Sequence, residues 1–380
     1  MRRRHWVCHA AASLGAGLFA PALRAQSNAI TLGQSAALSG PASALGEEFR
    51  RGALLQFERV NARGGIAGRN IELLSLDDGY EPERCAANTR DLLGRGVFAL
   101  FGYVGTPTSL AALPLATAAR VPFIAPFTGA EALRVPFNRY AFHVRASYFD
   151  ETAAIVKQLT SVGIQKVAVF HQNDSYGKAG LDGVVRALKA QQLEPAALGT
   201  VERNTVAVAA AVQAILAANP GAIVMICAYT SCAAFIRAAR KAGYGGNFYN
   251  VSFVGTQALA KELGADVRGV VVSQVMPYPF SPQTALVGDY LTAGKAAADA
   301  KGTKFEPNYS SVEGYVAARV LTEALRRPGG AASSDGLISA LESLRELNLG
   351  GFFVDFSAQK HTGSRFVDMT ILSADGKVRR

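Results

Sequence analysis

The sequence predicts an α/β protein with two doubly wound, Rossmann-like lobes. Short apolar runs typical of buried strands alternate with segments of helical spacing, which is the pattern of βαβ units around a parallel sheet. This pattern starts again near residues 141–145 and continues for a similar length. A chain of 380 residues with 49% hydrophobic and 18% charged residues also suits two globular domains with sizeable cores.

The first lobe is predicted from the segments before residue 144. Apolar runs predict its strands at 30–35, 71–76, 97–101 and 123–125. Helices are predicted between these strands, one with Phe49, Ala53, Phe57 and Val60 at helical spacing, one from Pro82 and one over 107–119.

The second lobe follows the same pattern, and the tail completes both lobes. Strands are expected at 166–170, 222–226, 247–251 and 270–275, and Asp150 is expected to cap the first helix of this lobe. The tail offers a helix at 312–325, a short helix near 335–345, a hairpin near 351–357 and a strand at 367–372. These are too few strands for a third core, so the chain is expected to cross between the lobes more than once.

The N-terminus has the plan of a secretory signal peptide over residues 1–25. Arg2, Arg3 and Arg4 precede a mildly apolar stretch, and small residues precede a cleavage site near Ala25. Arg3-Arg4 also resembles a twin-arginine signal, which would export the folded protein, and both routes stay open. No apolar run reaches the ~18 uncharged residues that a membrane span needs. We therefore expect a soluble, exported mature protein.

Charge and cysteine content exclude some classes of partner. Without the signal peptide the formal net charge falls from +10 to +6, and no basic run is interleaved with aromatic residues, so we expect no nucleic-acid partner. Few histidines remain and no CxxC occurs, so we expect no metal site. Cys227 and Cys232 are candidates for a small-loop disulfide or for two buried thiols, and Cys85 is expected to be packed on a helix face.

The sequence lacks the common motifs of catalysis and of cofactor binding. The first strand–helix turn has no G-x-G-x-x-G, and neither a P-loop nor a G-x-S-x-G elbow occurs. Asp77-Asp78 at a strand end is expected to cap the next turn rather than to act as a catalytic carboxylate pair. An exported hydrolase would need a nucleophile and a base that the sequence does not show. We therefore expect a binding protein without a cofactor, not an enzyme.

The stretch from Phe101 to Ser109 is the strongest candidate for a binding loop. A buried strand is followed by glycines, by Thr106 as the expected N-cap and by Pro107 at the first helical position. Such a helix start presents backbone N–H groups, a positive dipole end and hydroxyls, which suits a carboxylate or a phosphate. A second loop of similar design, at 123–131, strengthens this interpretation.

Several motifs, in a characteristic order, resemble the branched-chain amino-acid (Leu/Ile/Val) binding protein family, the periplasmic receptors of ABC importers. They are Ser39-Gly40-Pro41, the glycine-rich 61–68, Asp77-Asp78, the 102–109 loop, Tyr176-Gly177 and Tyr229. The 145–152 and 313–318 segments resemble a broad subgroup whose ligands vary widely. The resemblance implies a type I periplasmic binding fold whose lobes are joined by three crossover strands. The lobes would be 29–144 plus 278–348 and 145–277 plus 349–380.

The resemblance also implies the site residues. It places ligand contacts at Val104, Gly105, Thr106, Phe127, Thr128 and Gly129 in the first lobe, and at Tyr148, Glu151, Tyr176, Tyr229 and Ser252 in the second. A threonine usual in the second loop falls on Gly129 or Thr128. Two helix starts with hydroxyls would bind the carboxylate without a buried arginine.

The nature of the ligand stays open at this point. Where amino-acid binders carry an acidic group for the ligand's ammonium, this chain has Ser252. Glu151 is the alternative partner, unless it only stabilises the first turn of its helix. Amino acids, amides, 2-oxo acids and aromatic acids all remain candidates.

The implied role is delivery of a small carboxylate to a membrane permease. We expect a periplasmic monomer that depends on ABC permease and ATPase subunits. The alternative is a sensor whose closed form docks on a membrane signalling receptor.

Overall fold

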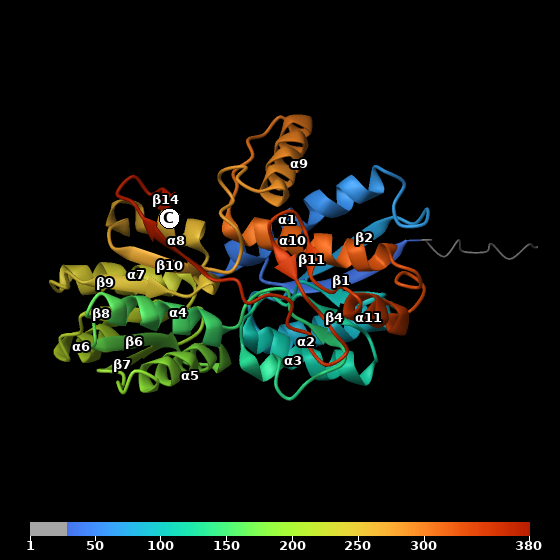
Figure 1. The fold of residues 1–380 in the computed structure, drawn as a ribbon. Coiled ribbons are helices and arrows are strands. Elements are labelled where there is room, and N and C mark those ends of the chain that lie inside the picture. The colour runs from blue at the N-terminus through green and yellow to red at the C-terminus, as the bar shows by residue number, and fades with distance from the viewer. Residues whose placement is uncertain (1–28) are drawn as a thin grey trace, which may run out of the picture.

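Two sheets form the centres of two lobes that lie side by side (Figure 1). The computed structural model describes residues 29–380, so the expected signal peptide lies outside the described residues. The first lobe has a parallel sheet in the order β2-β1-β3-β4-β5, and the second has a sheet in the order β14-β13-β10-β9-β8-β6-β7. The strand order reverses between β1 and β3 in the first sheet and between β6 and β8 in the second, and helices cover both faces of each sheet. This arrangement confirms the predicted fold class.

The first lobe is a layer of helices, a sheet and a second layer of helices. Its strands are β1 (Ile30–Ala36), β2 (Ile71–Asp77), β3 (Ala99–Phe101), β4 (Phe123–Ile124) and β5 (Ala141–Phe142). Its helices are α1 (Ser43–Asn61), α2 (Pro82–Gly94), α3 (Thr106–Ala118), α9 (Ala285–Lys301), α10 (Tyr309–Arg326) and α11 (Ser334–Glu342), with a 3₁₀ turn at Glu131–Leu133. Helix α1 packs against α10 on one face of the sheet, and α2 packs against α3 on the other. Residues of β1 on both faces are therefore buried, including the polar side chains of Gln34 and Ser35 near its carboxyl end.

The second lobe repeats this arrangement with two antiparallel edge strands. Its strands are β6 (Val167–Gln172), β7 (Leu198–Val201), β8 (Ala222–Ile226), β9 (Asn247–Asn250), β10 (Val270–Gln274), β13 (Asp368–Leu372) and β14 (Val378–Arg379). Its helices are α4 (Tyr148–Ser161), α5 (Ser175–Lys189), α6 (Ala209–Ala217), α7 (Tyr229–Lys241) and α8 (Thr256–Leu263), with 3₁₀ turns at Ser252–Val254 and Gly264–Val267. Strands β13 and β14 pair antiparallel, whereas the other strands of this sheet pair parallel.

Helix α4 starts three residues earlier than predicted. Ser147 is its N-cap, and its hydroxyl accepts a hydrogen bond from the backbone N–H of Asp150 at 3.1 Å. The Asp150 carboxylate accepts in return from the Ser147 N–H, which completes a capping box. The predicted cap at Asp150 is therefore wrong, because this carboxylate reaches back to a cap that lies before it.

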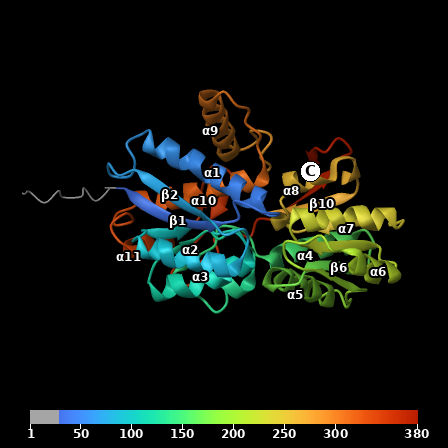
Figure 2. The ribbon, with the colours of Figure 1, turned by 180° about the vertical axis from the view of Figure 1, so that it is seen from behind.

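The chain passes between the lobes three times (Figure 2): after β5, between β10 and α9, and before β13. The hairpin of β11 (Leu347–Asn348) and β12 (Phe353–Val354) precedes the last passage. The segment after it still belongs to the first lobe, because the His143 N–H donates to the His361 carbonyl at 2.8 Å and the His361 ring stacks on Phe142. The boundary expected at 348/349 is therefore too early.

The structure also settles the cysteine alternatives. Cys227 and Cys232 are joined by a disulfide at the start of α7, with Cα atoms 6.0 Å apart. Cys85 is a buried free thiol on α2, as expected. Within residues 29–380, no helix combines the length and the apolar character that crossing a bilayer requires.

Candidate binding site between the two lobes

The candidate site lies where the carboxyl ends of parallel strands from both lobes face one another. Gln172, the last residue of β6, donates to the hydroxyl of Tyr80, which follows β2, at 3.4 Å. The Phe127 ring after β4 lies 5.5 Å from the Phe253 ring after β9. Ligands of open α/β sheets bind at this edge. The rings of the two lobes are in contact, so the cleft is closed, and the cavity beside Phe127 has a volume of only about 10 Å³.

The two predicted hydroxyl loops meet in the first lobe. The Thr106 and Thr128 hydroxyls are 2.6 Å apart, and Val104 and Phe127 form an isolated β-bridge. Both threonine side chains are fully buried. The Thr128 hydroxyl also lies 3.4 Å from the Tyr148 hydroxyl, which belongs to the second lobe. The loops therefore place hydroxyls and a helix start at the inter-lobe boundary.

The first loop starts its helix differently from the prediction. Thr106 is the first residue of α3 rather than its N-cap, and Gly105 is the N-cap with φ +102°. No side chain caps this helix start. A Cβ atom at Gly105 would lie 2.2 Å from the Tyr80 ring, so only glycine allows the loop to pack so closely.

The second loop presents its hydroxyl at Thr128, and Gly129 provides space for an aromatic ring. A Cβ atom at Gly129 would lie 2.7 Å from both the ring and the backbone N of Tyr148. The Gly129 carbonyl accepts from the Tyr148 N–H at 2.7 Å. A side chain at Gly129 would therefore push Tyr148 and the start of α4 away from the first lobe.

Aromatic rings from both lobes surround the hydroxyls. Tyr176 lies 5.4 Å from Tyr148 and 4.7 Å from Phe253, ring centre to ring centre. Phe253 also contacts Phe127 and lies 6.0 Å from Tyr80. Tyr80 and Phe253 were not predicted as site residues. Both follow the carboxyl end of a strand, and this position was a usable signal.

Arg145 brings a buried positive charge to the site, so the expectation of a site without a buried arginine is wrong. Its side chain is 1% exposed, and its guanidinium lies 5.0 Å from the centre of the Phe127 ring. One terminal nitrogen, Nη2, donates to the Ser252 hydroxyl and to Glu151. The other, Nη1, lies 3.5 Å from a carboxylate oxygen of Glu313. Burial lowers the pKa of Arg145, but the carboxylates of Glu313 and Glu151 outweigh burial and raise it overall.

Glu151 was the predicted substitute for the acidic group that Ser252 replaces, and the structure bonds Glu151 and Ser252 to each other. One Glu151 oxygen accepts from the Ser252 N–H at 2.7 Å and from the Ser273 hydroxyl at 2.6 Å. The other oxygen accepts from the Ser252 hydroxyl at 3.0 Å and from Arg145 at 3.4 Å. The fully buried Glu151 carboxylate therefore has all its acceptor positions in use.

Glu313, on α10 of the first lobe, is the second carboxylate near Arg145. It is 5% exposed, and no residue in the described part of the chain donates a hydrogen bond to it. The pKa of Glu313 is raised to about 7, mainly because burial disfavours the charged carboxylate. The positive charges of Arg145 and Arg134 oppose this rise, and the negative charge of Glu151 adds to it. Tyr309 lines the small cavity beside this carboxylate.

Comparison with known proteins identifies the family. A family model described as periplasmic binding protein matches residues 29–377. The chain belongs to the periplasmic binding protein family. This confirms the resemblance drawn from the sequence.

Similar structures and sequences agree with this membership. A possible leucine/isoleucine/valine-binding protein from Rhodopirellula baltica SH 1 has a TM-score of 0.87 and 34% identity, over 93% of this chain and 96% of that one. A substrate-binding periplasmic protein from Ralstonia solanacearum has a TM-score of 0.85 and 33% identity, over 92% and 99%. The Leu/Ile/Val-binding protein homolog 8 of Brucella suis biovar 1 is 25% identical over 352 residues, which are 88% of this chain and 85% of the relative. These relatives are binding proteins, not enzymes, and their family is periplasmic.

In this periplasmic binding protein, polar contacts of Arg203 and Asn204 with Glu81 and Gly79, which we call the Arg203 clasp, join the lobes beside the cleft. Arg203 of the second lobe binds Glu81 of the first lobe at 2.8 Å and Asp174 of its own lobe at 3.4 Å. Asn204 donates to Glu81 at 2.8 Å and to the Gly79 carbonyl at 3.2 Å. The clasp is a set of contacts that exists only when the lobes are close together.

Tyr229 lies at the edge of the cleft rather than with the other aromatic rings. It is the first residue of α7 and is 7% exposed. Burial raises the pKa of Tyr229, and hydrogen bonding to Ala44 and Ser43, at the start of α1, only partly opposes this rise. Tyr229 therefore reaches the first lobe, but at a different place from Tyr148 and Tyr176.

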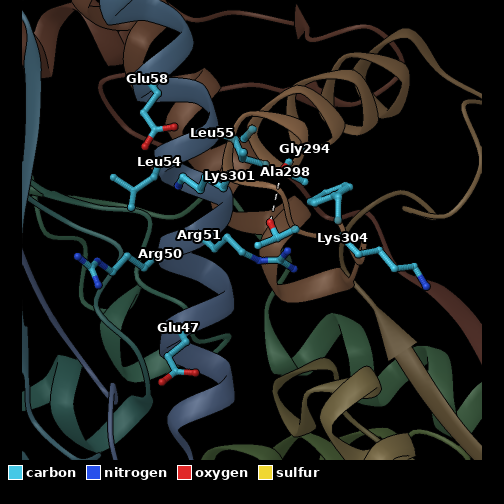
Figure 3. A pocket seen from close by; sticks show the side chains of 13 residues that line it. Glu47, Arg50, Arg51, Leu54, Leu55, Glu58, Gly294, Ala298, Lys301 and Lys304 are labelled. Carbon is cyan, nitrogen blue, oxygen red and sulfur yellow. Dashed lines mark hydrogen bonds between the residues drawn. The ribbon is translucent and has the colours of Figure 1, made fainter.

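One hollow of this periplasmic binding protein lies outside the cleft, between α1 and α9 (Figure 3). Its volume is about 230 Å³, and Leu55 of α1 points toward Gly294 and Ala298 of α9. None of the predicted ligand contacts lines it. Residues 29–380 contain no cluster of histidine, cysteine and acidic side chains that could hold a metal ion.

Proposed function

We propose that this protein is the solute-binding component of an ABC importer and that it binds a small carboxylate in the inter-lobe cleft. The observation that carries the proposal is the position of Arg145, a buried cation that contacts both lobes at the carboxyl ends of their strands. The hydroxyls of Thr106 and Thr128 add polar groups on the first-lobe side. Relatives named for leucine, isoleucine and valine support a ligand of this class.

The chemistry of the site suits a carboxylate attached to an apolar group. A buried carboxylate needs several charge-assisted hydrogen bonds to replace water, each contributing about 1.5–3 kcal/mol net. Aromatic rings from both lobes, including Tyr148, Tyr176 and Phe253, offer apolar faces to the rest of the ligand. Ligand contacts made to both lobes at once would favour the closed form.

Delivery to a permease and an ATPase is part of the proposal. The chain would capture the carboxylate in the periplasm and present its closed form to inner-membrane subunits. Uptake of the labelled ligand by cells that lack the permease separates import from sensing. Loss of uptake supports import, whereas unchanged uptake together with a transcriptional or motility response to the ligand that persists in these cells supports a receptor-docking sensor.

Paired ligands test the carboxylate directly. Mature protein, refolded to remove any bound compound, is screened by thermal shift with acids and with the primary amides of the same acids. A ligand at 100 times its Kd stabilises the protein by about 2.7 kcal/mol, enough to raise the melting temperature. Thr106→Ala should weaken all carboxylates alike, whereas Thr160→Ala, on the surface of α4, should not. Equal shifts with acids and amides would refute the assignment.

A further inference from the structure

We propose that Glu313 and Arg145 form the charged head of the ligand site and that Glu313 determines whether the bound acid carries an amino group. The inference rests on the proposed function and assigns a specificity-determining residue within that site. It moves the recognition of the amino group from the second lobe, where Ser252 and Glu151 lie, to α10 of the first lobe.

Unsatisfied donors mark the carboxylate position. A guanidinium has five N–H donors, and within the described residues neither Nε nor Nη1 of Arg145 finds a hydrogen-bond acceptor. The Tyr176 hydroxyl, also fully buried, has no partner there either. Buried donors without acceptors are rare in folded proteins, because leaving them unpaired is costly. Arg145 and Tyr176 together call for an anionic oxygen acceptor.

An unused acceptor lies next to these donors. The Glu313 carboxylate, 5% exposed, touches Arg145 only through the 3.5 Å ion pair and accepts no hydrogen bond from residues 29–380. It lines the same small cavity as Phe127 and Ser252, which belong to opposite sides of the cleft. Glu313 can therefore reach a ligand group that sits beside the carboxylate bound to Arg145.

Charge balance selects a ligand with both charges. A zwitterion that enters the Arg145–Glu313 pair gives its carboxylate to the arginine and its ammonium to the glutamate, so each buried charge keeps a partner. A simple acid would leave Glu313 ionised without a cation, or would force it to take up a proton. A simple amine would leave Nε and Nη1 of Arg145 without an acceptor. The pair is therefore complementary to an α-amino acid, and the aromatic rings favour an apolar side chain.

Glu151 cannot take this role without losing its own partners. Its oxygens already accept from Ser252, Ser273 and Arg145, and each of these donors would be left buried and unpaired. Ser252 has its hydroxyl between Arg145 and Glu151. These two residues hold Arg145 in position and are positioning residues in this scheme.

The test compares matched ligands on matched variants of the mature chain. Calorimetry measures the affinity for L-leucine and 4-methylpentanoate, and for L-phenylalanine and 3-phenylpropanoate. Wild-type protein should bind the amino acids at least about tenfold more tightly than the acids without an amine. Glu313→Gln should abolish this preference while changing the affinity for the simple acids by less than about threefold. Glu342→Gln, a carboxylate of the same lobe that pairs with His361, should leave the preference unchanged.

Each outcome decides between the hypotheses. A wild-type preference for the simple acids, or an unchanged preference in Glu313→Gln, overturns the inference but leaves the carboxylate function intact. Absence of binding in both series overturns the proposed function itself. If Glu313→Gln does not fold, as judged by circular dichroism, proton exchange in wild-type protein decides. Amino-acid binding at pH 6 should then release a proton from Glu313, and proton uptake would contradict the inference.

Discussion

Gly105→Ala should destabilise the protein by forcing the first hydroxyl loop away from Tyr80. In the structure Gly105 has φ +102°, and an added Cβ atom would lie 2.2 Å from the Tyr80 ring and 3.0 Å from the Thr108 hydroxyl. Tyr80 is fully buried and contacts Phe253 of the second lobe. The ring therefore cannot move without disturbing the closed cleft.

The expected loss follows from two separate effects. Gly105 has φ +102° and ψ 154°, a backbone region essentially restricted to glycine, so an alanine there costs about 1–3 kcal/mol. Overpacking against a buried ring adds about 1–3 kcal/mol. Gly105→Ala should therefore lower the free energy of unfolding by about 2–6 kcal/mol. Gly163→Ala is the matched control, because Gly163 has φ +81° and no atom within 4 Å of an added Cβ, so only the first effect applies.

Urea unfolding of both variants measures the difference. Gly105→Ala should unfold at a clearly lower urea concentration than Gly163→Ala, and it should also bind carboxylates more weakly because the start of α3 moves. Equal losses of stability in the two variants would refute the close packing of Tyr80 on Gly105 in the closed cleft.

Three further predictions concern closure, pH and the disulfide. Arg203→Ala removes a partly exposed inter-lobe pair worth about 1 kcal/mol, so ligand affinity should fall about fivefold at low salt and less at high salt. Arg95→Ala, at the C-cap of α2 and paired with Asp91 of its own helix, should leave ligand affinity unchanged. Affinity for an amino acid should fall as pH drops below about 7, because protons compete with the ligand's ammonium for the Glu313 carboxylate. Calorimetry across pH 5–8 checks this. An affinity that falls with rising pH would instead indicate a ligand without an amine. Cys232→Ser should lower the free energy of unfolding by about 2 kcal/mol, the estimate for a short closed loop, and an unchanged urea midpoint would contradict a stabilising bond to Cys227.

Local patterns predicted most of the fold, because apolar periodicity and turn residues act over short distances. The strands at 30–36, 71–77 and 222–226 match the predicted runs within one residue. The start of α4 was missed for a local reason, because Ser147 is the N-cap and Asp150 is the residue that bonds back to it. The last lobe boundary was missed for a long-range reason, because the stacking of His361 on Phe142 joins residues 219 positions apart in the sequence.

The site was harder to predict than the fold. Thr106 and Thr128 lie at helix starts or strand ends, where motif spacing identifies them, and they do meet in space. The charged cluster could not be found in this way, because Arg145, Ser252 and Glu313 come from three separate segments of the chain. Only the passage of the chain between the lobes brings them together. Arg145, where the chain first crosses between the lobes, was a usable signal for a carboxylate site, but the sequence prediction did not include it.

The position of Arg145 also explains how one site can serve both binding and closure. It lies just after β5, at the first passage between the lobes, and its partners Glu313 and Glu151 belong to opposite lobes. A ligand that inserts between Arg145 and Glu313 would replace a direct inter-lobe ion pair by two contacts that also need both lobes. Closure would then depend on differential binding to the closed state, with the Arg203 clasp adding a smaller and salt-sensitive share. Substitution of Arg145 should accordingly weaken ligand binding and closure together, whereas substitution of Arg203 should weaken closure without changing which ligands are preferred.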